Sequence, residues 1–78
     1  MVNYWTEELE ELIKPGNRLE IETRDEVMPI EIREIVDENY IVYCFLANGE
    51  IYDIDPIEYF YFFSEDDEIE MRVSNESN

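Results

Sequence analysis

The chain has 78 residues, of which 22 are acidic, 5 are basic and none is histidine, so its formal net charge is −17 at pH 7. This length allows one domain at most, and an apolar fraction of 45% predicts a folded core rather than a disordered chain. Because phosphate groups are bound by lysine and arginine, the charge argues against direct binding to nucleic acid or to an anionic membrane. It predicts a partner with a basic surface.

The first predicted element is a helix over residues 4–14. Thr6 can cap its N-terminus, and Pro15 and Gly16 end it. Apolar residues at the spacing i, i+4, i+7 and i+8 form one stripe, which must pack on another element because so short a helix is not stable alone. The members of this stripe are Trp5, Leu9, Leu12 and Ile13.

After the first helix, alternating apolar and polar residues predict about five short antiparallel strands. In the second of them the alternation slips at Glu34, which predicts a bulge, and Pro29 predicts that this strand starts at a sheet edge. The next segment is apolar on both faces and predicts a central strand. The candidate segments lie at about 18–24, 28–36, 40–46, 50–55, 59–63 and 68–73.

Two further stretches carry local signals. Asn48 and Gly49 lie between apolar runs and predict a two-residue hairpin turn. Residues 57–63, IEYFYFF, are compatible with a helical turn or with a strand. Because aromatic residues are enriched in strands, we expect a short turn at 55–58 followed by a strand.

These elements together predict an α+β fold, with an N-terminal helix followed by the strands in a strongly bent sheet or a small, partly closed barrel. The SH3-like and Sm-like barrels have a similar order of elements, which is an analogy of architecture alone. We expect a single domain over residues 1–73 and a polar tail over 74–78.

The sequence predicts no catalytic residue, no cofactor and no enzymatic activity. It has no histidine, and its few serine and threonine residues have no pattern of bases near them. Cys44 lies within the most apolar strand and is expected to be a buried structural thiol. A single cysteine cannot form an internal disulfide, and no apolar run approaches the roughly 18 residues that a membrane-spanning helix needs. We therefore expect a cytoplasmic protein.

A weak candidate for a metal site lies in the sequence DIDPIE, where Asp53, Asp55 and Glu58 cluster around a turn. Calcium takes six to eight oxygen ligands, usually from a loop that contains glycine. The spacing of a calcium-binding loop is absent here. A specific site for a divalent cation is therefore the less favoured interpretation.

Acidic residues at alternate strand positions predict a binding surface. Strand residues two apart lie roughly 6.6 Å apart on one face, which is close to the spacing of successive phosphates along a nucleic-acid strand. The alternative is that these positions are merely solvated, but a solvated face would mix lysine with glutamate. The predicted acidic contact residues are Glu20, Glu22, Glu31, Glu65, Asp66, Asp67, Glu68 and Glu70.

The aromatic run beside the sequence SEDDE predicts the apolar part of the same surface. In a strand, Tyr59, Tyr61 and Phe63 would share one face and contact a partner. Protein interfaces combine aromatic residues at the centre with charged residues at the rim. The alternative is that the N-terminal helix covers these aromatic side chains.

Small size, strong acidity and the lack of catalytic groups resemble the DNA-mimic inhibitors that phages and mobile elements use against restriction, CRISPR, transcription or repair proteins. The resemblance includes no sequence motif. It implies a protein that occupies the basic nucleic-acid site of its partner in the cytoplasm of a host cell. Two alternatives stay open: a structural or regulatory subunit that forms a homodimer or a larger homo-oligomer, and a small module that binds divalent cations.

Overall fold

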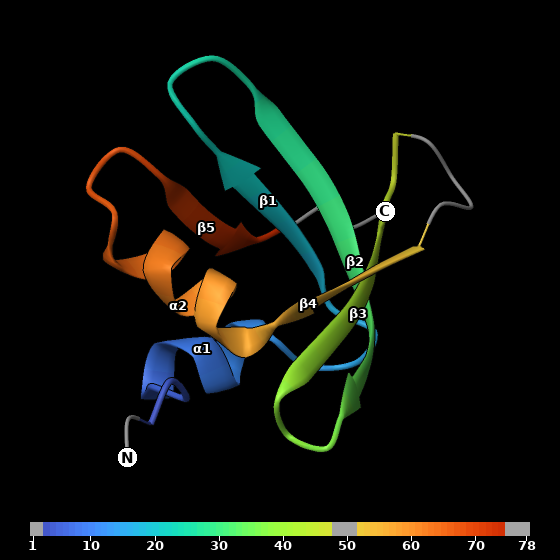
Figure 1. Ribbon diagram of the computed structural model, residues 1–78. Helices are drawn as coiled ribbons and strands as arrows, with labels where there is room; N and C mark the ends of the chain where they lie inside the picture. The colour runs from blue at the N-terminus through green and yellow to red at the C-terminus, as the bar shows by residue number, and fades with distance from the viewer. Residues whose placement is uncertain (1–2, 48–51, 75–78) are drawn as a thin grey trace.

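A single antiparallel sheet of five strands forms the centre of the computed structural model, which describes residues 3–47 and 52–74 (Figure 1). The strand order is β4-β3-β2-β1-β5, so β4 and β5 are the two edges and the described strands do not close into a barrel. The predicted α+β class is confirmed. In chain order the elements are α1 (Glu7–Leu12), β1 (Arg18–Glu22), β2 (Val27–Val36), β3 (Tyr40–Phe45), β4 (Tyr52–Pro56), α2 (Ile57–Glu65) and β5 (Glu70–Val73).

The first helix is shorter than predicted but begins at the predicted cap. The side-chain oxygen of Thr6 accepts a hydrogen bond from the backbone N–H of Leu9 at 3.2 Å, which satisfies one of the free N–H groups at the helix start. Trp5 precedes this cap, and its indole N–H donates to the carbonyl oxygen of Glu38 at 2.8 Å. Gly16 has a φ of +95°, which glycine adopts without steric cost. The turn after α1 therefore depends on this glycine.

The irregular second strand was predicted in part. The register between β2 and β3 shifts between Ile32 and Glu34, which confirms the bulge. The expectation that this strand starts at an edge holds locally, because residues 27–29 pair with β1 alone, although β2 as a whole is the central strand and β3 lies beside it. Pro29 is tolerated because the pairing of β2 with β3 begins one residue later, with Ile30 opposite Phe45. The predicted turn at Asn48 and Gly49 lies outside the described residues.

The prediction of a strand over 59–63 was wrong, since residues 57–65 form the helix α2. Pro56 ends β4 and precedes the helix, and Ile57 and Phe60 follow at the spacing of one helical turn. The side chain of Phe60 is only 2% exposed, whereas that of Phe62 is 54% exposed. Because strand preference mainly reflects how a side chain packs, the neighbouring sheet decides the conformation of this aromatic run.

Both helices cover the same face of the sheet (Figure 1). The inward positions of β1 and β2 are those that the alternation predicted, with Leu19, Ile30 and Ile32 fully buried. The opposite face is open to solvent. The buried core consists of Leu9, Leu12, Ile13, Leu19, Ile21, Ile30, Ile32, Ile41, Tyr43, Ile57, Phe60 and Met71.

Candidate protein-docking surface

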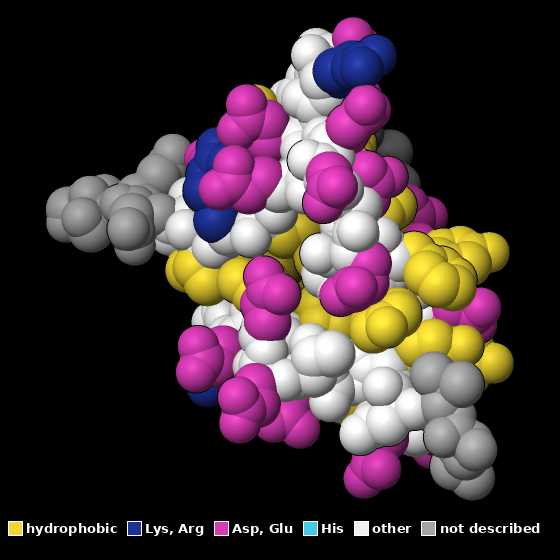
Figure 2. Space-filling view, turned by 90° about the vertical axis from the view of Figure 1, so that its left-hand side faces the viewer, with side chains coloured by type: hydrophobic (Ala, Val, Ile, Leu, Met, Phe, Trp, Pro, Cys, Tyr) yellow, Lys and Arg dark blue, Asp and Glu magenta, His cyan; other side chains and the backbone are white. Residues whose placement is uncertain are grey.

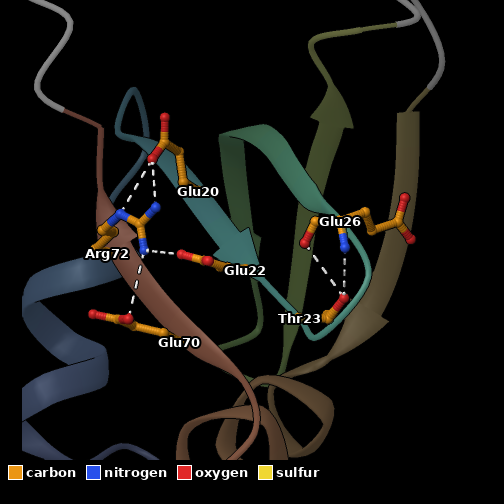
Figure 3. Close-up of polar contacts among 6 residues, drawn as sticks. All are labelled: Glu20, Glu22, Thr23, Glu26, Glu70 and Arg72. Atoms are coloured by element: carbon orange, nitrogen blue, oxygen red, sulfur yellow. Dashed lines mark hydrogen bonds and ion pairs between the residues drawn. The ribbon is translucent and has the colours of Figure 1, made fainter.

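Three of the predicted acidic contact residues surround one arginine on the open face of the sheet (Figure 3). The antiparallel register places Arg72 of β5 opposite Glu20 of β1, and Glu70 opposite Glu22. The guanidinium of Arg72 lies 3.1 Å from a carboxylate oxygen of Glu20, 2.9 Å from Glu22 and 3.6 Å from Glu70. A hydrogen bond to Glu22 is the main cause that raises the pKa of Arg72. Arg72 therefore neutralises part of the negative charge of these three glutamates.

Replacing Arg72 with glutamine is expected to lower the melting temperature at low salt. The change leaves Glu20, Glu22 and Glu70 adjacent without a cation, and like charges on neighbouring strands repel. Raising the ionic strength from about 0.01 M to about 1 M shortens the Debye length from about 30 Å to about 3 Å and should restore most of the loss. Thermal unfolding followed by circular dichroism over this salt series checks the prediction.

The matched control is Arg24→Gln, which removes one cation from a single exposed ion pair with Glu68. Such pairs contribute little to stability. Equal, salt-independent losses in the two variants would contradict the assigned role of Arg72.

Four other predicted acids lie together at the end of α2 and in the connection to β5. Glu65 is the last residue of α2, and a carboxylate oxygen of Asp66 accepts a hydrogen bond from the backbone N–H of Glu68 at 2.9 Å. Glu68 pairs with Arg24 at 3.1 Å. Glu65, Asp66 and Asp67 are exposed and have no ion pair with any residue between 3 and 47 or 52 and 74. They form the unpaired part of the predicted set.

Glu31 lies apart from both groups. It is on the open face of β2, where its carboxylate is 3.0 Å from the guanidinium of Arg33. The structure thus places the eight predicted acidic residues in three locations, and each location contains one arginine that forms an ion pair there.

The helix distributes the predicted aromatic contact residues differently from a strand. Tyr59 is 51% exposed, but Tyr61 and Phe63 are partly buried, so these three do not share an exposed face. Phe62 is exposed instead, and the strand prediction placed it on the other side. Part of the run is covered by Tyr4, whose ring centroid lies 5.2 Å from that of Tyr61. A prediction of a helix over residues 57–63 would have identified Phe62 as an exposed aromatic residue.

The outer side of α2 therefore combines aromatic and acidic side chains. Residues three and four apart are neighbours on a helix surface, so Phe62 lies next to Glu58, Tyr59 and Glu65. Figure 2 shows this side of the molecule, with acidic side chains above and below hydrophobic ones. We name this region the α2 surface, and define it by Glu58, Tyr59, Phe62, Glu65, Asp66 and Asp67.

A small apolar pocket lies between α2 and the inner face of the sheet. It has a volume of about 110 Å³ and is lined by Tyr43, Phe45 and Phe60 together with aliphatic side chains of β1 and β2. The carboxylate of Asp55 also lines it and accepts a hydrogen bond from the Tyr43 hydroxyl at 2.5 Å. Sequence reasoning missed this pocket, because residues distant in the chain form it.

Among the described residues, the structure brings together no set of metal ligands at Asp53, Asp55 and Glu58, the weak metal candidate. Asp55 is engaged by Tyr43, and among residues 3–47 and 52–74 no group of three or more acidic or cysteine side chains is placed to hold a metal ion. Cys44 is buried and has a free thiol, as predicted. No helix within the same ranges is long and apolar enough to cross a bilayer.

Replacing Tyr43 with phenylalanine is expected to change how stability depends on alkaline pH. Burial, aided by the hydrogen bond to Asp55, raises the pKa of Tyr43 in the folded protein. An unfolded tyrosine ionises near pH 10, so this contribution to stability is fully present below about pH 10 and is lost as pH rises above it. Urea unfolding at neutral pH and above pH 10 should show a smaller alkaline loss in Tyr43→Phe.

The same variant should lose about 1.5–3 kcal/mol at neutral pH, the usual net value of one hydrogen bond to a charged group. Tyr59→Phe is the control, because its side chain is half exposed and it should retain the wild-type pH dependence. An unchanged alkaline loss in Tyr43→Phe would show that Tyr43 does not cause it.

Comparisons of the chain with models of known protein families, with curated proteins and with solved structures found no match. The fold and the α2 surface describe this chain as a small α+β domain that has one open sheet face and one helix with exposed acidic and aromatic side chains.

Proposed function

We propose that this protein binds a basic, nucleic-acid-handling protein and blocks its nucleic-acid site as an acidic mimic. The observation that carries the proposal is the α2 surface, in which the exposed rings of Tyr59 and Phe62 adjoin carboxylates that have no ion pair with a described residue. Aromatic contacts with a charged rim are typical of protein interfaces. In this arrangement the apolar rings hold the complex, and the acids attract the basic partner and orient it.

The placement of the basic residues also supports an acidic contact surface. Arg24, Arg33 and Arg72 each form at least one ion pair with a carboxylate, so three of the five basic residues are paired with acids. Lys14 lies beside the exposed glutamates of α1. A nucleic-acid backbone would find no basic patch among these residues, whereas a basic protein surface would meet negative charge on several sides.

We assign the main contact to the α2 surface rather than to the paired glutamates of β1. Arg72 sits between Glu20 and Glu22, so any partner must either displace it or accept a weaker field there. Glu65 and Asp67 carry no such counter-charge from a described residue. A basic partner can pair with such free carboxylates without first breaking an existing ion pair, so only their water has to be displaced.

The reducing cytoplasm of a host cell is the proposed setting, since Cys44 is free and buried. The targets implied by the resemblance to DNA mimics are restriction, CRISPR, transcription or repair proteins. Each presents lysine and arginine in a groove that phosphates normally occupy.

The proposal is tested by capturing partners on the immobilised protein and eluting them with DNA or RNA. A mimic should release a basic protein when nucleic acid is added at a salt concentration too low to elute it alone. The alternative of a structural subunit predicts instead a homo-oligomer whose size, measured by light scattering, does not change with salt. A captured protein that nucleic acid cannot release would contradict the proposal.

A further inference from the structure

We propose that the apolar pocket between α2 and the sheet takes the side chain of an arginine from the basic partner. This inference rests on the proposed function and names one specific contact within it. The occupant's alkyl stem would lie against the aromatic walls, and its guanidinium would meet Asp55.

The walls of the pocket suit a cation with an apolar stem. Five aromatic side chains line it, from Tyr43 and Phe45 of β3 and from three residues of α2. The ring of Tyr43 meets those of Phe45 and Phe60 nearly edge to face, with centroids 5.6 Å and 5.4 Å apart. Differently oriented rings offer both faces and edges to an occupant, and a guanidinium stacks on aromatic faces.

The charge at the pocket favours a cation over a neutral apolar group. Asp55 is a partly buried carboxylate whose recorded hydrogen bond, from Tyr43, uses one of its two oxygens. No described residue gives it an ion pair, since those of Arg24, Arg33 and Arg72 go to other carboxylates. Asp53 points to the same side of β4, opposite Tyr43 in the strand register. A guanidinium would therefore enter a negative environment.

The size of the pocket indicates a single side chain. A volume of about 110 Å³ is well below the roughly 300–1,000 Å³ of pockets for drug-sized molecules. Tyr59 links the two regions, because it lines the pocket and is half exposed on the α2 surface. An arginine on a partner docked at α2 would reach the pocket without a change in the fold.

The test uses n-propylguanidinium, which reproduces the arginine side chain, and its neutral analogue n-propylurea. Each is titrated into the full chain while methyl signals are followed by NMR. Met28 and Ile30 line the pocket and report binding there, whereas Ile54 on the open face reports non-specific contact. We expect saturable shifts at Met28 and Ile30 with n-propylguanidinium, much weaker ones with n-propylurea, and none at Ile54.

Two conservative variants separate the local charge from the overall charge. Asp55→Asn keeps the shape and an acceptor for Tyr43, and should weaken binding of n-propylguanidinium roughly tenfold, the worth of one charged hydrogen bond. Asp37→Asn makes the same change at an exposed site outside both the pocket and the α2 surface and should leave that binding unchanged. Tyr59→Ala, which removes an exposed wall, should weaken binding while the folded spectrum is retained.

Three results would overturn the inference: equal binding of n-propylurea, no shift at the pocket methyls, or equal losses in Asp55→Asn and Asp37→Asn. The titration requires no partner protein. Its failure therefore leaves the competition with nucleic acid intact as a test of the proposed function. Conversely, a pocket that binds n-propylguanidinium in a protein that never competes with nucleic acid would refute the mimic alone.

Discussion

Phe60→Ala should destabilise the protein by about 3–5 kcal/mol, the usual cost of removing a buried phenylalanine. The ring is 2% exposed and packs against Tyr43 and Phe63, with centroids 5.4 Å and 6.2 Å away. A domain of this length has a total stability of only about 4–12 kcal/mol. The variant is therefore expected to lose a large share of the total stability of the protein, as measured by urea unfolding and circular dichroism.

The control is Phe62→Ala, two residues away, where the ring is 54% exposed. We expect this change to cost less than about 1 kcal/mol, because only edge contacts with neighbouring rings are lost. In a strand the two side chains would share one face and the two variants would lose similar stability. Equal losses would therefore contradict the helix α2.

Reversing two acids of the α2 surface should slow association with the basic partner about tenfold or more at low salt, since steering by charge acts on the encounter. The variant is Glu65→Lys with Asp67→Lys, both exposed and without an ion pair among the described residues. Asp66 is left in place because it accepts the hydrogen bond from the Glu68 N–H. Surface plasmon resonance over a salt series should also show a flatter salt dependence.

The matched control is Glu10→Lys with Glu34→Lys, which are also exposed and lie on α1 and β2. Each double reversal changes the net charge by +4, from −17 to −13. A general attraction between opposite charges would slow association equally in both variants. Equal slowing would therefore contradict the assignment of the contact to α2.

Phe62→Ala should change the dissociation rate constant of the complex rather than the association rate constant. An aromatic anchor holds a complex after it has formed, so its loss should speed dissociation with little change in association. Because the fold is expected to survive this change, loss of binding can be assigned to the interface. Unchanged dissociation would place the partner elsewhere on the molecule.

The features predicted correctly depend on short stretches of chain. Thr6 caps a helix through a residue three positions away, and the alternation around Leu19 and Ile30 identifies the buried side of two strands. The sequence indicates the bulge before Glu34 through two adjacent apolar residues, Ile35 and Val36, which interrupt the alternation. In each case neighbouring residues contain the whole signal.

The features that were missed depend on contacts between distant residues. Arg72 hydrogen-bonds to Glu20, 52 positions earlier, and only the pairing of β5 with β1 brings them together. The helix α2 forms because a sheet built from β1, β2 and β3 offers Phe60 a place to pack. Strand preference of aromatic residues is too weak to decide such a case. The acidic surface was predicted by composition, but its division into paired and unpaired parts was not.

The central claim, that this protein and nucleic acid occupy the same site, is tested most directly by equilibrium competition on the purified partner. A labelled DNA or RNA that binds the partner is followed by fluorescence anisotropy while this protein is added at fixed ionic strength. The account predicts complete displacement of the label, and displacement by Glu65→Lys with Asp67→Lys only at much higher concentrations. A ternary complex in which the partner holds both ligands with unchanged affinity would contradict it.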